Sequence, residues 1–196
     1  IHYRKRLEHV RLLLSLGASA LAEVRLPNVF SDSTVLQRDK VIKVWGWAAP
    51  GEHVKVLLTG TAAEATADAA GEWKVQLPAM AAGGPHELTV SGKNTLRVGN
   101  ILVGEVWVCS GQSNMEFELK HAKDAQQEIK DANYPQIRLL LVPRTPAGLP
   151  LNDVKARWFV CSPWSTPGRS AWPCCTASPA AARPRCTCGW RRPSDR

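Results

Sequence analysis

The residue whose setting best suits chemistry is Ser113, in the segment Ser-Gly-Gln-Ser-Asn-Met-Glu at positions 110–116. The nearly continuous apolar run at 101–109 predicts a buried strand before it, and the Glu-, Lys-, Ala- and Gln-rich run at 116–132 predicts a helix after it. A serine on a sharp strand-to-helix turn can project its hydroxyl above a sheet, where the helix N-terminus offers N–H groups to a developing oxyanion. Ser113 is therefore a candidate nucleophile for acyl transfer.

The residues around Ser113 limit the kind of turn it can occupy. Gly111 supplies the small residue that a sharp bend needs, whereas Met115 stands where the G-x-S-x-G elbow has its second glycine. The segment is therefore not the α/β-hydrolase signature. Ser113 also fits a helix N-cap, because Glu116 follows three residues later as in a capping box. The two roles are geometrically compatible.

The region 23–100 carries the alternation and turn signals of a β-sandwich. Pro-Gly, Gly and Asn turns separate short runs, and the alternation at 54–57 and 73–77 buries one face of each strand. The predicted strands are 34–37, 41–47, 53–58, 73–77, 87–90 and 95–98.

From residue 101 the pattern changes to strand, helix and strand, at 101–109, 116–132 and 137–142. That order is typical of the start of an α/β sheet. We therefore expect a mixed β and α/β fold class, with an N-terminal β-sandwich followed by the first strand-helix-strand unit of a truncated α/β domain over 101–166.

The first 22 residues have the pattern of a secretory signal peptide. A basic stretch at 1–9 precedes an apolar run at 10–22 that closes with Ala-Leu-Ala. An ordinary amphipathic N-terminal helix is the alternative. The pattern predicts a secreted or periplasmic protein, and we expect no membrane anchor because no later apolar run reaches the required ~18 residues.

The formal charge of +8 is carried by the two ends of the chain, since residues 1–12 contribute +3 and residues 167–196 contribute +5. The neutral body argues against a nucleic-acid partner. The final segment, 167–196, contains no Leu, Ile, Val, Phe or Met and cannot form a packed core. We interpret it as a disordered tail read from a shifted frame of a GC-rich gene. A basic tail and a Cys-rich knot are alternatives, although the CxxC spacing of a zinc site is missing.

Only two of the six cysteines, Cys109 and Cys161, lie in the body of the chain. Each sits in an apolar, strand-like run, so a disulfide between them and a pair of buried free thiols are both compatible with the sequence. No metal and no organic cofactor is implied by any pattern in the chain.

The segment 104–116, Gly-Glu-Val-Trp-Val-Cys-Ser-Gly-Gln-Ser-Asn-Met-Glu, resembles the first active-site block of the sialate O-acetylesterases, in the SGNH-hydrolase superfamily. The segments 25–38, 44–52 and 71–73 also resemble the β-rich N-terminal region of that family, so the resemblance covers 23–165. It implies that Ser113 is the nucleophile and that its own N–H is one oxyanion donor. Three neighbours would help shape the site: Gln112, Asn114 and Glu116. The implied substrate is an acetylated carbohydrate.

The family completes its site with an Asp and a His in a late D-x-x-H pattern, which this chain lacks. The sequence at 118–121 imitates the spacing, but eight helical residues would place His121 about 12 Å along the axis from Ser113. His53 and His86 fall in the β region, and His2 and His9 precede the predicted cleavage site. We therefore expect a truncated carbohydrate O-acetylesterase that is inactive as given.

A protein of a different class fits part of the same sequence. A non-catalytic carbohydrate-binding or accessory β-sandwich could use Trp45, Trp47 and Trp73 to stack on sugar rings, although tryptophans of this kind are more often core residues. The sequence does not choose between sialic acid and plant polysaccharide as the acetylated sugar. It carries no signal for the oligomeric state.

Overall fold

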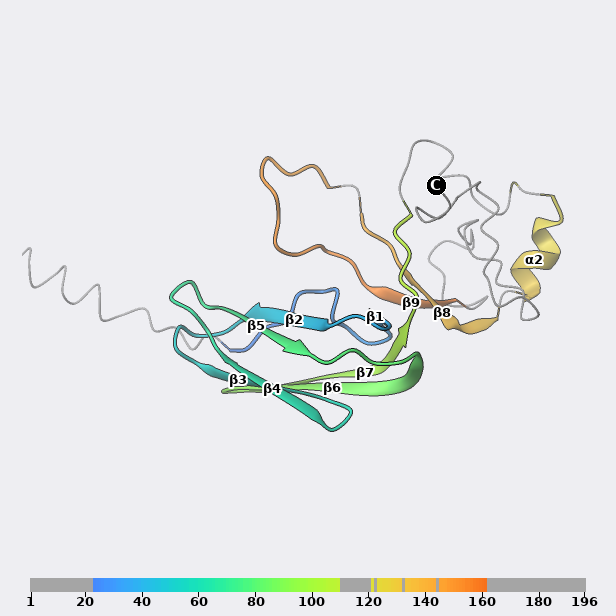
Figure 1. Ribbon diagram of the computed structural model, residues 1–196. Helices are drawn as coiled ribbons and strands as arrows, with labels where there is room; N and C mark the ends of the chain where they lie inside the picture. The colour runs from blue at the N-terminus through green and yellow to red at the C-terminus, as the bar shows by residue number, and fades with distance from the viewer. Residues whose placement is uncertain (1–22, 110–120, 122, 132, 144, 162–196) are drawn as a thin grey trace, which may run out of the picture.

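The computed structural model describes residues 23–109, 121, 123–131, 133–143 and 145–161 (Figure 1). The first stretch holds seven strands and the later stretches hold one short helix and two strands. The strands of the first stretch are β1 (Val35–Gln37), β2 (Ile42–Trp47), β3 (His53–Leu58), β4 (Thr61–Thr66), β5 (Glu72–Leu77), β6 (Gly83–Ser91) and β7 (Thr95–Gly104). The later elements are α2 (Ala125–Asp131), β8 (Tyr134–Leu140) and β9 (Trp158–Cys161).

The first seven strands form two sheets around one core. The larger sheet has the order β1-β7-β6-β3-β4, and β1 runs parallel to β7 while the other neighbours are antiparallel. The smaller sheet pairs β2 with β5 antiparallel. Alternate residues of both sheets point inward and join a single buried cluster that includes Val44, Val54, Val56, Leu58, Val75, Leu77, Leu88, Val90, Ile101 and Val103. The β-sandwich expected from the alternation is thus the architecture of this part.

Every predicted strand of the sandwich is confirmed, with bounds that differ by a few residues, but β4 was not predicted. This strand has the sequence Thr-Ala-Ala-Glu-Ala-Thr and buries no large side chain. It lies at the edge of the larger sheet and, among the described strands, pairs only with β3, through a two-residue turn at Thr59 and Gly60, both with positive φ. Such a turn matches the twist of a hairpin. The turn residues therefore indicate the β3–β4 hairpin, which the hydrophobic pattern of β4 does not.

The predicted strand at 101–109 is confirmed only as far as Gly104. Residues 101–104 are the end of β7, which runs through the expected domain boundary at 100 and 101, and they lie in the sandwich. Residues 105–109 form no strand, and Val108 is 77% exposed. The ladder ends at Gly104 because its partner β1 ends at Gln37. The apolar run therefore extends beyond the strand that it predicts.

The predicted helix at 116–132 is wrong as one continuous element. Within the described residues a turn at 123–124 precedes α2, and Asp124 has φ 59°, which no residue of a right-handed helix adopts. Aspartate tolerates this conformation better than most residues. Residues 116–120 lie outside the described part of the chain.

The second apolar run, predicted at 137–142, corresponds to β8. This strand pairs antiparallel with β9, and among the described residues it has no pairing with β7. The parallel strand-helix-strand unit is therefore not seen in the described part, which is β-rich with one short helix. No helix among the described residues combines the length and apolarity that crossing a bilayer requires.

Candidate functional site

The four residues predicted to form the catalytic site all lie outside the described residues: Ser113, Gln112, Asn114 and Glu116. The structure describes instead the segment that leads to them, which leaves the sandwich at the end of β7. Its geometry shows how the start of that segment is held.

Gln37, the last residue of β1, holds the start of this segment through its side-chain amide. Its Oε1 accepts a hydrogen bond from the backbone N–H of Val106 at 3.0 Å, and its Nε2 donates to the carboxylate of Glu105 at 3.4 Å. The backbone N–H of Arg38 also donates to the carbonyl of Gly104 at 2.9 Å. The Gln37 side chain therefore supplies the hydrogen bonds that hold the chain just beyond the end of the β1–β7 ladder. No local sequence pattern marks Gln37 as a support of this segment, although the residue lies within the segment 25–38 that carries the resemblance.

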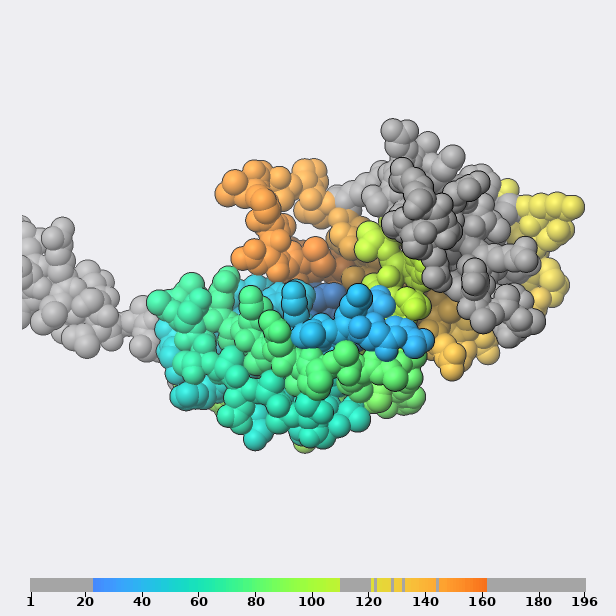
Figure 2. All heavy atoms as spheres, viewed as in Figure 1, coloured from blue at the N-terminus to red at the C-terminus, as the bar shows by residue number. Residues whose placement is uncertain are grey.

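The loop before β1 forms hydrogen bonds with β9 and with the segment between β8 and β9. Asn28 donates its backbone N–H and its Nδ2 to the two carboxylate oxygens of Asp153, each at 2.8 Å. The carbonyl of Val29 accepts a hydrogen bond from Nε1 of Trp158 at 2.8 Å. In Figure 2 the lower of the two orange bands lies against the sandwich, as these bonds require, whereas the upper band stands away from it. This loop is part of the segment 25–38, which carries the resemblance.

Neither described histidine of the sandwich is placed as a general base by a carboxylate. His53 and His86 each share a hydrogen bond of their Nδ1 with a threonine hydroxyl, at 3.1 Å from Thr66 and 3.0 Å from Thr59. Both are strand residues, at the start of β3 and within β6. His121 is exposed and precedes α2. The segment 113–120 lies outside the described residues, so the predicted 12 Å separation stays a prediction.

The two described cysteines are free thiols, so of the two possibilities left by the sequence the disulfide is not formed. Cys161 is buried in β9, and burial raises the pKa of its thiol, partly offset by a backbone hydrogen bond from Tyr134. Cys109 is exposed, contrary to the burial that its apolar run suggested. In the described ranges no group of three or more His, Cys, Asp or Glu side chains is arranged to hold a metal ion.

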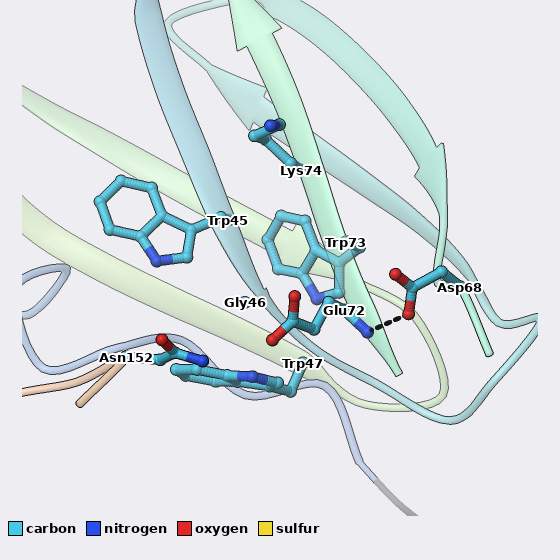
Figure 3. A pocket seen from close by; sticks show the side chains of 8 residues that line it. All are labelled: Trp45, Gly46, Trp47, Asp68, Glu72, Trp73, Lys74 and Asn152. Carbon is cyan, nitrogen blue, oxygen red and sulfur yellow. Dashed lines mark hydrogen bonds between the residues drawn. The ribbon is translucent and has the colours of Figure 1, made fainter. Parts of the chain in front are cut away.

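The outer side of the β2–β5 sheet carries a pocket of about 350 Å³ (Figure 3). The ladder places Trp45 opposite Lys74 and Trp47 opposite Glu72. We call this the tryptophan pocket and define it by its lining residues: Trp45, Gly46, Trp47, Asp68, Glu72, Trp73, Lys74 and Asn152. Asn152 comes from the connection between β8 and β9, and the other residues come from the sandwich.

The three tryptophans considered as sugar-stacking residues have different surroundings. Trp73 is 3% exposed and belongs to the core, and its buried Nε1 has no hydrogen-bond partner among the described residues. Trp45 is 37% exposed and packs edge-on against Phe30, with ring centroids 4.9 Å apart. Trp47 is partly exposed, and the guanidinium of Arg25 lies 5.5 Å from its ring centroid. Two of the three indoles are therefore accessible.

Comparison with known proteins gives a consistent result, although no family model matches the sequence. The chain is 34% identical to the sialate O-acetylesterases of Homo sapiens and Pongo abelii over 172 residues, which is 80% of this chain and 32% of each relative. Among solved structures, a carbohydrate acetylesterase from Xanthomonas citri matches with 42% identity and a TM-score of 0.69. That match covers 71% of this chain and 33% of the other.

These proteins agree with the resemblance carried by the segments 25–38, 44–52 and 104–116. The chain spans about a third of the length of the curated relatives that it matches. Over that third of their length, the chain is a sialate O-acetylesterase-like sequence.

Proposed function

We propose that this chain is part of a serine esterase that removes acetyl groups from sugars. The observation that carries the proposal is the match to the Xanthomonas citri carbohydrate acetylesterase, at 42% identity and a TM-score of 0.69. The block at 104–116, which contains Ser113, supplies the residue type that such chemistry needs. The acetylated sugar is either sialic acid or a plant polysaccharide.

The proposed reaction is acyl transfer through Ser113. Its Oγ attacks the carbonyl carbon of the acetyl ester while a base takes the hydroxyl proton, and that proton then passes to the departing sugar oxygen. Water hydrolyses the acetyl-enzyme and releases acetate. The N–H of Ser113 is one donor to the oxyanion, and Gln112, Asn114 and Glu116 shape the site around it. Nothing in these steps needs a metal ion or an organic cofactor.

We further propose that the 196-residue chain has negligible esterase activity by itself. The family pattern places the Asp and His of the triad in a D-x-x-H sequence, and no Asp in this chain is followed by His at that spacing. Serine hydrolases that lose their base lose roughly four to six orders of magnitude in rate. His53 and His86 offer no replacement, because each is bonded to a threonine within the sandwich.

The proposed organisation of the chain follows the sequence analysis. Residues 1–22 act as a signal peptide, and the mature protein is secreted or periplasmic. A β-sandwich over 23–100, which β7 extends to Gly104, precedes the first part of an SGNH-type α/β domain over 101–166. We propose that residues 167–196 are read out of frame.

A fusion protein tests the esterase proposal. Residues 23–161 replace the aligned segment of the Xanthomonas citri acetylesterase, and acetate release is measured from an O-acetylated sialic acid and from acetylated xylo-oligosaccharide. We expect turnover that Ser113→Ala lowers at least about 10⁴-fold, because the nucleophile is lost. A fusion that folds, with a cooperative melting transition, but shows no serine-dependent turnover would refute the proposal.

The 196-residue chain alone is assayed in parallel with its own Ser113→Ala variant. We expect both to release acetate at the background rate, because neither has a base. Serine-dependent turnover by the chain alone would contradict the proposed inactivity and leave the esterase proposal intact.

A further inference from the structure

The tryptophan pocket takes no part in the proposed chemistry of Ser113. Its lining comes from residues 45–74 and from Asn152, whereas the catalytic block is at 104–116. We propose that this pocket binds a neutral pyranose ring of an oligosaccharide or polysaccharide. This inference goes beyond the esterase, because binding needs neither the nucleophile nor a base.

Two indoles form the apolar part of the site. Trp45 and Trp47 are alternate residues of β2, so both side chains lie on its outer face. Figure 3 shows the two rings on the same side of the pocket as Asn152, with Trp47 seen edge-on. A pyranose ring presents C–H bonds with partial positive charge, and the face of an indole carries partial negative charge. Stacking of sugar on indole is the contact that this pair offers.

The indoles are held in place by residues outside the pocket lining. Phe30 packs edge-on against Trp45, and Arg25 lies over the ring of Trp47. Both contacts are made by side chains of the sandwich itself. Binding therefore orders no additional aromatic side chain, which lowers its entropic cost.

Polar side chains around the indoles suit the hydroxyl groups of a sugar. Glu72, Lys74 and Asn152 line the pocket, and within the described residues their side chains make no hydrogen bond. A carboxylate accepts hydrogen bonds, an ammonium donates them, and an amide does both. Asp68 is different, because its Oδ1 already accepts the backbone N–H groups of Ala70 and Glu72. Three side chains are thus available to a ligand.

The charges around the pocket suit a neutral sugar. Asp68 and Glu72 contribute two negative charges, Lys74 contributes one positive charge, and Arg25, over the ring of Trp47, contributes a second positive charge. These charges cancel, so the pocket offers no excess positive charge to the carboxylate of a sialic acid and suits a neutral pyranose. The volume of about 350 Å³ is near the lower end of ligand pockets, which span roughly 300–1,000 Å³. A site of this size fits one or two sugar rings.

Ligand-observed NMR with the full 196-residue chain tests the proposal, with cellotetraose as the neutral probe and N-acetylneuraminic acid as the acidic one. We expect cellotetraose to bind, and N-acetylneuraminic acid to bind at least about tenfold more weakly. Trp45→Ala and Trp47→Ala should each raise the Kd for cellotetraose at least about tenfold, because each removes one stacking surface. Trp45→Phe, which keeps an aromatic face, should retain most of the binding.

Leu57→Ala is the matched control, because Leu57 is 40% exposed and lies on β3 of the other sheet. It should leave the Kd unchanged. The proposal is overturned if folded wild-type chain does not bind cellotetraose, if N-acetylneuraminic acid binds as tightly, or if Leu57→Ala weakens binding as much as the tryptophan variants. Acetate release plays no part in the readout, so failure here is separate from failure of the fusion enzyme.

Discussion

Replacing Glu52 by Ala should strongly destabilise the β-sandwich. Glu52 is 9% exposed, and its two carboxylate oxygens accept backbone N–H groups from Ala49 at 3.0 Å and from Lys93 at 2.6 Å. The carboxylate thereby joins the turn before β3 to the turn between β6 and β7. Hydrogen bonds to charged groups contribute about 1.5–3 kcal/mol each, and removing the acceptor leaves both donors partly buried without a partner.

Two such bonds give an upper range of about 3–6 kcal/mol. Because both contacts are only partly buried, water can reach the exposed donors, and we expect a loss of about 3 kcal/mol in the free energy of unfolding. Glu52→Gln keeps one acceptor and places an NH₂ group against the other donor, so it should cost about 2 kcal/mol. Losses of this size are large against the ~5–15 kcal/mol of a typical domain.

The assay is urea unfolding followed by tryptophan fluorescence, since buried Trp73 reports on the core. Glu64→Ala is the matched control, because Glu64 is an exposed glutamate whose carboxylate makes a surface ion pair with its ladder partner Lys55 at 3.2 Å. That variant should change the unfolding free energy by less than about 1 kcal/mol. If Glu52→Ala costs no more than Glu64→Ala, the structural role given to the buried carboxylate is wrong.

Three further predictions concern the start of the proposed catalytic block, the thiols and the loop contact. In the fusion enzyme, Gln37→Leu should lower kcat about tenfold and leave KM within twofold, because the start of the proposed catalytic block loses its hydrogen bonds to the Gln37 amide. A tenfold rise in KM would contradict a positioning role. In the native chain, peptide-resolved alkylation at neutral pH should label Cys109 well before Cys161, whose buried thiol has a raised pKa and so a smaller thiolate fraction; equal labelling rates would contradict this. Asp153→Ala should raise hydrogen exchange at the amide of Asn28, which loses its acceptor, and unchanged exchange would show that the contact does not persist in solution.

The sandwich could be predicted because its strands carry a local signal. In β3 and β5 every second residue is buried, and the printed sequence shows that alternation directly. β4 escaped because an alanine-rich edge strand has no apolar stripe. The break after Gly104 escaped because the end of β7 is set by the length of its partner strand, which apolar character at 105–109 does not reveal.

The candidate site was found through its neighbours along the chain, and its supports were missed because they are distant in sequence. Gln37 reaches Val106 across 69 positions, and Asn28 reaches Asp153 across 125. No local pattern encodes such contacts. The tryptophan pocket was anticipated only as three candidate residues, because the ladder register that separates core Trp73 from the outer indoles depends on the pairing of β2 with β5.

The sandwich core has a consequence for the order of events during synthesis on the ribosome. Every residue of its buried cluster lies between Val24 and Val103, so the whole cluster can form once β7 has left the exit tunnel. The partners of Asn28 and Val29, Asp153 and Trp158, emerge about fifty residues later. The nascent chain can therefore complete the β-sandwich first. The loop before β1 is then in place to bind β9 and the segment before it.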